Sequence, residues 1–169
     1  MIESTIIAAF PGAGKTYWHR LHPDTTSDSD SSAFSWIDTP RGRVRNPEFP
    51  GNYIEHIKSL IGVKEIIFIS THIQVIEAML AHEIEFINVL PVREAKELYL
   101  EKYRARGSDD AFIALVDNKW DEWHDQFEAY VPSVPHNKLY IKEHLTELMD
   151  LRECPWEVPH MLGRWLKTL

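Results

Sequence analysis

The chain has 169 residues, of which 44% are hydrophobic and 26% charged, an ordinary composition for one globular domain with a buried core. Its formal net charge of −8 argues against nucleic acid as a partner, because proteins that bind nucleic acid broadly present a basic footprint. Cys154 is the only cysteine, which excludes an internal disulfide and suits a cytoplasmic protein. No apolar stretch reaches the length that a bilayer requires, so no membrane partner is expected.

The first residues predict a strand, a tight loop and a helix in that order. Residues 4–9 form a short, largely apolar segment, which is typical of a buried strand. A turn rich in glycine and proline follows. A helix is expected over Lys15–Leu21, because Pro23 ends it. A second short strand is expected at 25–29. The prolines of Ser35–Pro50 then favour a loop.

In the middle of the chain, helices alternate with strands. Residues 52–60 predict a helix, residues 65–70 predict a strand covered on both faces, and residues 72–81 predict another helix. A further buried strand is expected at 85–90. The expected apolar side of the first helix is Tyr53, Ile54, Ile57 and Leu60, and that of the second is Ile73, Ile76, Met79 and Leu80.

Two longer helices are expected next. Pro91 suits the first position of a helix that continues to about Arg104 and is ended by Gly107. Ser108 predicts the N-cap of the following helix, with Asp109 and Asp110 in its first turn. The apolar stripe expected on that helix is Phe112, Val116, Trp120, Trp123, Phe127 and Tyr130.

The C-terminal part predicts one more strand at 138–141 and short helices at 144–151 and 161–169. Strands that alternate with helices favour an α/β fold with a parallel sheet of about five strands flanked by helices. We therefore expect one three-layer domain over residues 1–169, with residues 152–169 as a C-terminal extension.

The loop after the first strand fits the P-loop pattern. We therefore expect a P-loop NTPase-type fold. Glycines allow successive main-chain N–H groups to point at phosphate oxygens, and the next helix directs its positive end at the same anion. Lys15 is expected to reach the β- and γ-phosphates of ATP, and Thr16 to ligate Mg²⁺. The expected phosphate-binding residues are Pro11, Gly12, Ala13, Gly14, Lys15 and Thr16, with Ala9 in place of the usual first glycine.

Acidic side chains follow the second expected strand. Asp28 and Asp30 lie where a parallel strand ends, and ligands of open α/β sheets bind at that edge. A carboxylate there can hold Mg²⁺ or accept a proton from a substrate. A solvated loop of Asp and Ser is an equally good interpretation. The strand at 65–70 is followed by no acidic residue, which disfavours a motor ATPase or a GTPase.

Two groups of arginines are candidates for binding phosphate. Arg104 and Arg106 can clamp a transferring phosphoryl group if the helix ends between them, although cations also favour helix C-termini without any such role. Within Ser35–Asn52, a possible acceptor-binding loop, the arginines can hold an acceptor phosphate while Tyr53, Phe49 or Trp36 stacks on a base. A mobile surface loop explains that segment about as well. Its arginines are Arg41, Arg43 and Arg45.

Four segments together resemble a family of small phage and prophage P-loop proteins described as nucleotide-kinase-like or ATP-binding. They are Phe-Pro-Gly-Ala-Gly-Lys-Thr, Asp-Ser-Asp-Ser-Ser, Asn-Pro-Glu-Phe-Pro-Gly-Asn-Tyr-Ile and Tyr-Arg-Ala-Arg-Gly, and the resemblance extends to about Ile141. The chain is also distantly similar to nucleoside monophosphate kinases of the adenylate kinase type. That likeness implies phosphate and Mg²⁺ contacts for Lys15 and Thr16, and lid roles for Arg104 and Arg106.

These observations together favour a cytoplasmic, ATP- and Mg²⁺-dependent phosphotransferase, in the host cytoplasm if the chain is phage-encoded. The expected acceptor is a small nucleotide, and the expected catalytic residues are Lys15, Asp28, Asp30, Arg104 and Arg106. Two alternatives stay open: an ATP-binding accessory protein without turnover, and a kinase of a non-nucleotide acceptor.

Overall fold

The computed structural model describes residues 2–130 and 138–147. Its packing separates two compact units. The described residues of 1–11 and 15–88 form unit 1, and those of 12–14 and from Val89 onward form unit 2. Residues 148–151 of the helix predicted at 144–151, the predicted helix at 161–169 and the extension 152–169 lie outside the described residues.

The fold is α/β, with a five-stranded parallel sheet flanked by helices, as the alternation of elements predicted. The strand order is β2-β5-β1-β6-β7. In unit 1, β5 pairs in parallel with both β1 and β2, and Asp28 of β2 lies in register with Phe68 of β5. The sheet strands are β1 Thr5–Ala9, β2 Thr26–Asp28, β5 Ile66–Ile69, β6 Ile87–Pro91 and β7 Lys138–Ile141.

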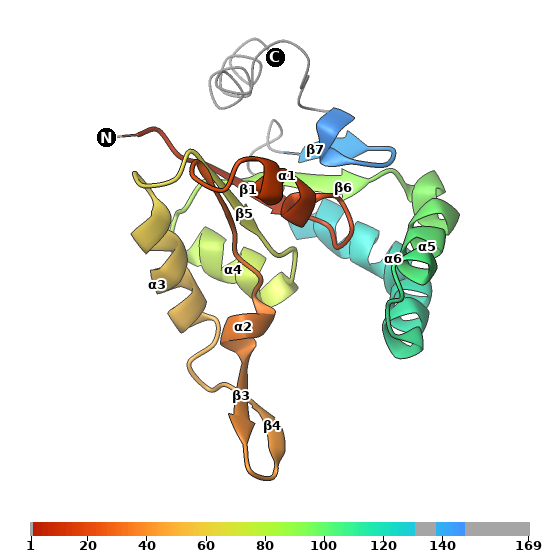
Figure 1. The fold of residues 1–169 in the computed structure, drawn as a ribbon, viewed down its shortest axis with the longest axis horizontal. Coiled ribbons are helices and arrows are strands. Elements are labelled where there is room, and N and C mark those ends of the chain that lie inside the picture. The colour runs from red at the N-terminus through yellow and green to blue at the C-terminus, as the bar shows by residue number, and fades with distance from the viewer. Residues whose placement is uncertain (1, 131–137, 148–169) are drawn as a thin grey trace. The chain divides into compact units, whose positions relative to one another are not determined.

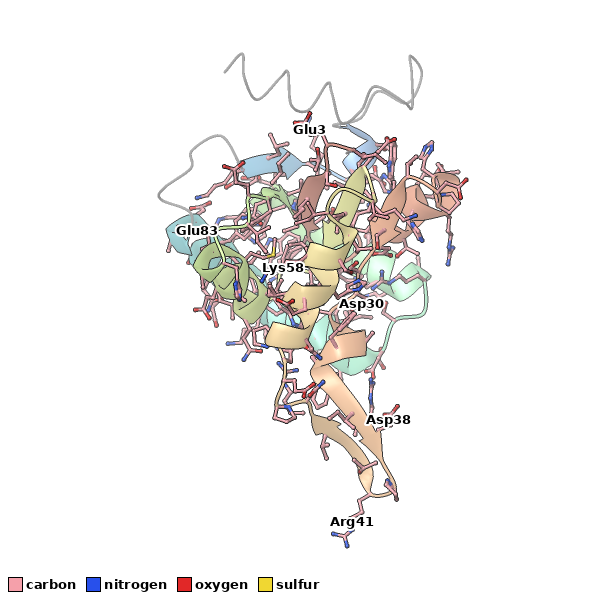
Figure 2. The ribbon with its side chains drawn as sticks, turned by 90° about the vertical axis from the view of Figure 1, so that its left-hand side faces the viewer. Glu3, Asp30, Asp38, Arg41, Lys58 and Glu83 are labelled. Carbon is pink, nitrogen blue, oxygen red and sulfur yellow. The ribbon has the colours of Figure 1, made fainter. Side chains whose placement is uncertain are left out.

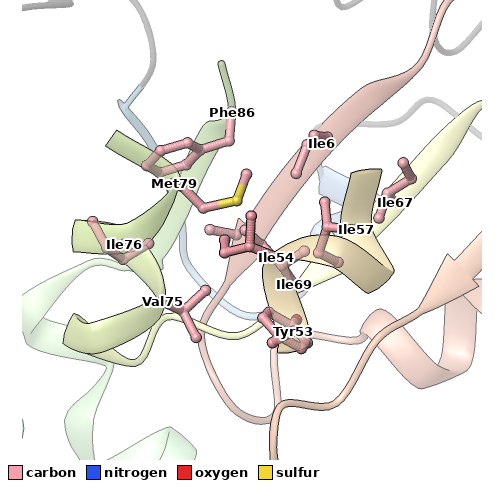
Figure 3. Packing of buried hydrophobic residues seen from close by; sticks show 11 residues of the cluster. Ile6, Tyr53, Ile54, Ile57, Ile67, Ile69, Val75, Ile76, Met79 and Phe86 are labelled. Carbon is pink, nitrogen blue, oxygen red and sulfur yellow. The ribbon is translucent and has the colours of Figure 1, made fainter. Parts of the chain in front are cut away.

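The core of unit 1 lies between one face of β1 and β5 and two helices (Figure 3). These helices are α3 Gly51–Leu60 and α4 Ile73–Ala81. Strand residues alternate in direction, so Ile6 and Ala8 of β1 share this face with Ile67 and Ile69 of β5. The helices contribute Tyr53, Ile54, Ile57, Val75, Ile76 and Met79.

The predicted apolar stripe of α4 was partly wrong. Ile76 and Met79 are buried as expected, but Val75 takes the expected place of Ile73, which is half-buried. Leu80 is 41% exposed. Seven of the nine helical residues are Ile, Val, Leu, Met or Ala, so the sequence does not mark which side meets the sheet.

The loop expected at Ser35–Pro50 was also wrong, because its first part is folded. A short helix, α2 Ser32–Ser35, leads into an antiparallel hairpin of β3 Trp36–Thr39 and β4 Gly42–Arg45. This two-stranded ribbon extends away from α2 and α3 (Figure 1). Ribbon residues alternate without burying either face, so they lack the hydrophobic pattern that normally marks a strand.

Unit 2 contains β6 from Val89 onward, β7 and two helices, α5 Lys96–Ala105 and α6 Asp110–Tyr130. The 3₁₀ turns η1 Arg93–Ala95 and η3 Leu145–Glu147 complete it. The prediction that Pro91 starts a helix was wrong, because Pro91 is the last residue of β6. The expected end of α5 is confirmed: Gly107 has a φ of 74°, and Ser108 N–H donates to the Tyr103 carbonyl at 2.9 Å.

The predicted N-cap of α6 is also corrected. The Asp109 carboxylate accepts a hydrogen bond from Ala111 N–H at 2.6 Å, so Asp109 caps the helix. Ser108 Oγ instead accepts from Arg106 Nε at 2.7 Å. The buried stripe of α6 is Ile113, Val116, Trp120, His124 and Phe127, while Phe112 and Trp123 are half-buried and the side chain of Tyr130 is not described.

His124 was not expected in the core. Its Nδ1 lies 2.7 Å from the Trp120 carbonyl and its Nε2 lies 2.9 Å from the Pro91 carbonyl. The ring also packs against the Trp120 ring, with centroids 4.8 Å apart. His124 therefore joins α6 to the end of β6 through polar contacts. Across the described part of the chain, no helix is long and apolar enough to span a bilayer.

Candidate functional site

The predicted P-loop connects β1 to α1 Lys15–Leu21, so the strand, loop and helix lie where the motif requires them. Gly12 has a φ of 79° and Gly14 a φ of 109°. These are conformations that residues with a Cβ rarely adopt, and they explain why glycines occupy both positions. The positive φ values show that the loop has the backbone turns that a phosphate-binding nest uses.

Lys15 folds back over the start of the loop. Its Nζ donates to the Ala9 carbonyl at 2.6 Å and to the Phe10 carbonyl at 3.2 Å. Both oxygens belong to unit 1, at the carboxyl end of β1 and the residue that follows it. The ammonium group is thus held at the edge of the sheet where ligands of α/β proteins bind.

Thr16 and Asp28 meet in unit 1, as the predicted metal site requires. The Thr16 hydroxyl donates to Asp28 Oδ2 at 2.5 Å. Thr16 is in the first turn of α1 and Asp28 is the last residue of β2, so two separate elements supply the pair. Hydroxyl and carboxylate oxygens are the ligands that Mg²⁺ prefers. Among the described residues, no cluster of three His, Cys, Asp or Glu side chains has a metal-site arrangement.

Asp30 lies two residues beyond β2 and is exposed. Its Oδ1 accepts from Ser32 N–H at 2.9 Å, so this carboxylate also stabilises the turn into α2. Asp30 is near the Tyr53 hydroxyl, because its charge acts on the pKa of that group. The structure therefore places Asp28 and Asp30 at the same end of β2, as the sequence predicted.

Tyr53, one of the three rings expected to stack on a base, does not offer a face for stacking. It is fully buried, and its hydroxyl donates to the Ser29 carbonyl at 2.6 Å. Burial raises the pKa of this hydroxyl, the hydrogen bond from Ser70 N–H opposes that change, and Asp30 and Asp28 raise the pKa further. Tyr53 ties the end of β2 to the end of β5 and acts as a support beneath the carboxylates.

His72, directly before α4, is close to charged groups of the predicted site. Desolvation by its surroundings lowers the pKa of His72, although the residue remains exposed to solvent. The positive charges of Arg45 and Lys15 lower the pKa further, whereas Asp30 raises it. The charges of three separate segments of unit 1 therefore act on His72, which follows the carboxyl end of β5.

The three arginines of the ribbon do not form one cluster. Arg45 lies at the base, where its guanidinium donates to Gln74 Oε1 at 2.7 Å. Arg43 pairs with Asp38 at 3.2 Å, and Arg41 lies at the tip (Figure 2). Arg41 lies in the turn before β4 and Arg45 ends that strand, which at roughly 3.4 Å per residue spans about 10 Å from Gly42 to Arg45. That the three arginines hold one acceptor phosphate stays a prediction, and Arg45 is the one whose charge acts on His72.

In unit 2, Tyr103 lies against the P-loop. A Cβ placed on Gly12 would come 2.9 Å from Tyr103 Cε1, so the absence of a side chain at Gly12 makes room for the ring. Arg106 stacks over the same ring, with Cζ 4.7 Å from its centroid, and also lies 5.9 Å from the ring of Phe112. Arg106 is thus positioned beside Gly12 by two aromatic rings and by its hydrogen bond to Ser108.

The end of α5 separates the two predicted lid arginines. Helix α5 ends at Ala105, so Arg104 is helical and Arg106 is the C-cap residue, as the prediction required. Both are exposed. Arg106 has the stacking and hydrogen-bonding contacts described above, whereas the Arg104 side chain has no hydrogen bond, ion pair or ring contact among the described residues. Of the two, Arg106 has a defined place in unit 2.

The segment after β7 also reaches the P-loop within unit 2. Leu145 N–H donates to the Ala13 carbonyl at 2.8 Å. The His144 ring lies so close to Gly14 that a Cβ there would be 2.1 Å from Nε2. Thr146 N–H donates to His144 Nδ1 at 3.2 Å, which orients the ring. Residues 144–146 therefore form a second support for the middle of the loop.

Nothing in the amino-acid sequence predicted this support. His144 has no motif around it and no ligand-type spacing to another histidine, so only the fold could reveal its place. Tyr103 belongs to the Tyr-Arg-Ala-Arg-Gly segment, in which a functional role was predicted only for the two arginines. No protein-family model matches the chain, and a search of curated proteins finds no significant match.

Proposed function

We propose that the protein is an ATP-dependent phosphotransferase whose P-loop, Ala9–Thr16, holds the triphosphate. The observation that carries this proposal is the hydrogen bond from Thr16 to Asp28, which pairs the P-loop hydroxyl with a carboxylate at the end of the neighbouring strand. Phosphoryl-transfer enzymes of the P-loop type need such oxygen ligands beside the phosphates. The positive φ values of Gly12 and Gly14 support the same interpretation.

The residues present fit Mg²⁺. Thr16 and Asp28 offer two oxygen ligands, and Mg²⁺ takes its remaining ligands from water and phosphates rather than from a complete protein cage. Bound there, the ion supplies neutralisation of charge on the β- and γ-phosphates. Lys15 leaves the Ala9 and Phe10 carbonyls to contact the same phosphates.

The proposed reaction moves the γ-phosphoryl group from ATP to an oxygen of the acceptor. The bond between the γ-phosphorus and the bridging oxygen breaks, which leaves ADP, and a new phosphorus–oxygen bond forms to the acceptor. If the acceptor is a hydroxyl, Asp30 takes its proton. Arg106, held by Tyr103, stabilises the transferring group, and Arg45 contacts an anionic acceptor.

The direct test incubates the purified protein with Mg-ATP and a panel of nucleoside monophosphates and nucleosides, and follows ADP formation. The proposal expects turnover with at least one acceptor, and loss of that turnover in Lys15→Ala. Arg20→Ala is the matched control, because Arg20 is an exposed cation in α1 with no assigned role. ATP binding without phosphorylation of any acceptor would contradict the kinase assignment and favour the accessory-protein alternative.

A further inference from the structure

The β3–β4 ribbon has no role in either core. Seven of its eight strand residues are exposed, and Thr39 is half-buried. Directly paired residues of an antiparallel ribbon share a face, so the pairing assigns each side chain of the ribbon to one of two faces. Trp36, Asp38, Arg43 and Arg45 lie on one face, while Ile37 and Val44 lie on the other.

The first face combines an aromatic ring with guanidinium groups. Trp36 is 41% exposed, although tryptophan is highly buried on average. Arg45 Cζ lies 5.1 Å from its ring centroid, and Arg43 Cζ lies 5.9 Å from it. Phe49 adds a second ring 5.3 Å from Arg45. Flat aromatic and guanidinium surfaces of this kind stack on nucleobases.

The charge of the ribbon is opposite to that of the chain. Between Trp36 and Arg45 there are three arginines and only one acidic residue, Asp38, whereas the whole chain has a net charge of −8. An acidic chain that gathers cations on one exposed arm has a local site for an anion there. The net charge of the whole chain does not reveal this local concentration of positive charge.

The length of the ribbon decides what kind of anion fits. A mononucleotide offers one phosphate group, whereas the arginines extend from Arg41 in the turn to Arg45 at the end of β4, a strand that spans roughly 10 Å from Gly42. A ligand that uses all three arginines must carry repeated negative charges along a chain. We propose that the ribbon, Trp36–Arg45, binds single-stranded nucleic acid, with Arg41, Arg43 and Arg45 along its phosphates and Trp36 against a base.

This inference goes beyond phosphoryl transfer and does not depend on it. The test measures the fluorescence anisotropy of a fluorescein-labelled oligothymidylate titrated with the full chain over a range of salt concentrations. Wild type is expected to bind. The variant R41Q/R43Q/R45Q is expected to bind at least about tenfold more weakly, and its slope of log affinity against log salt should fall by roughly two, because each lost phosphate contact removes about 0.7.

A separate variant tests the contribution of the aromatic ring to the proposed binding. Trp36→Ala is expected to weaken binding by roughly tenfold at all salt concentrations, with an unchanged salt slope, because stacking releases no counterions. The matched control is R20Q/K58Q/K119Q, which removes the same number of positive charges from helix positions outside the ribbon. That control should bind like wild type.

Lys15→Ala separates this inference from the proposed function. It should lose ATP binding and keep oligonucleotide binding, so failure of one proposal leaves the other standing. Equal affinity of wild type and R41Q/R43Q/R45Q for the oligonucleotide would overturn the inference. So would ribbon-dependent binding of polyglutamate in place of the oligonucleotide, or ribbon-dependent self-association in analytical ultracentrifugation. Unchanged circular dichroism of each variant confirms that it is folded.

Discussion

The imidazole of His144 lies against the Cα of Gly14, so that a Cβ at Gly14 would be 2.1 Å from Nε2, 2.4 Å from Cε1 and 2.7 Å from Cδ2. The ring fills the space that the missing side chain leaves. Because Leu145 N–H also donates to the Ala13 carbonyl, the loop after β1 is held by a distant segment as well as by its own glycines. The loop geometry therefore depends on a residue far along the chain.

Gly14→Ala should abolish binding of triphosphate and lower the melting temperature. The new methyl group collides with His144, and a φ of 109° is strained for any residue with a Cβ. Calorimetry with Mg-ATP and a thermal melt measure the two effects. Gly51→Ala is the control: it begins α3, its new Cβ meets nothing within 4 Å, and it should leave both quantities nearly unchanged.

Asp28→Asn should lower the apparent affinity for Mg²⁺ in the presence of ATP. The amide keeps the shape of the side chain but loses the charge that the proposed ion requires, so we expect a loss of about ten- to hundredfold in apparent Mg²⁺ affinity. Titration of Mg²⁺ at constant ATP measures it. Thr16→Ser keeps the hydroxyl and should stay close to wild type, whereas Thr16→Val should behave like Asp28→Asn. A wild-type Mg²⁺ response in Thr16→Val would contradict the assignment.

Arg106→Lys should lower kcat more than it changes ATP affinity. Lysine keeps the charge but cannot stack flat on the rings of Tyr103 and Phe112 or donate through a planar fork. Steady-state kinetics with the best acceptor of the panel separates the two parameters. Arg104→Lys is the comparison, and because Arg104 has none of these stacking contacts, the smaller effect is expected there. The reverse order would assign the clamp to Arg104.

His124→Phe should destabilise the protein by about 2–4 kcal/mol. The new ring fills a similar volume, but the carbonyls of Trp120 and Pro91 lose their polar partner in a buried place. The free energy of unfolding comes from urea denaturation. His82→Phe, at an exposed position after α4, should change it by less than about 0.5 kcal/mol.

Acidification should destabilise the fold through His56 and His72. Desolvation lowers the pKa of both side chains below the ordinary value of 6.5. The unfolded chain therefore binds protons at a higher pH than the folded chain does. Stability is complete above pH 6.5 and falls as the pH decreases through that value towards the folded-state pKa values. Urea denaturation at several pH values measures the slope, and it should be smaller in His56→Gln and His72→Gln than in wild type.

Local chemistry was enough to predict several elements from the sequence. The P-loop helix was expected at Lys15–Leu21 and the last strand at 138–141, and both have these bounds in the structure. Proline, glycine and continuous apolar runs influence the secondary structure of neighbouring residues. Their effect can therefore be predicted without knowledge of contacts to distant segments. The same locality explains why Thr16 and Asp28 could be placed at one edge of the sheet.

Only the tertiary structure decided the contacts that depend on residues distant in sequence. The ribbon at Trp36–Arg45 has no buried face to impose a pattern, and the burial of Val75 and His124 depends on which surface each helix meets. Likewise, His144 meets Gly14 because the chain returns to the P-loop after β7. Hydrogen bonds and packing between distant segments follow from the path of the whole chain, and no local preference of these residues encodes that path.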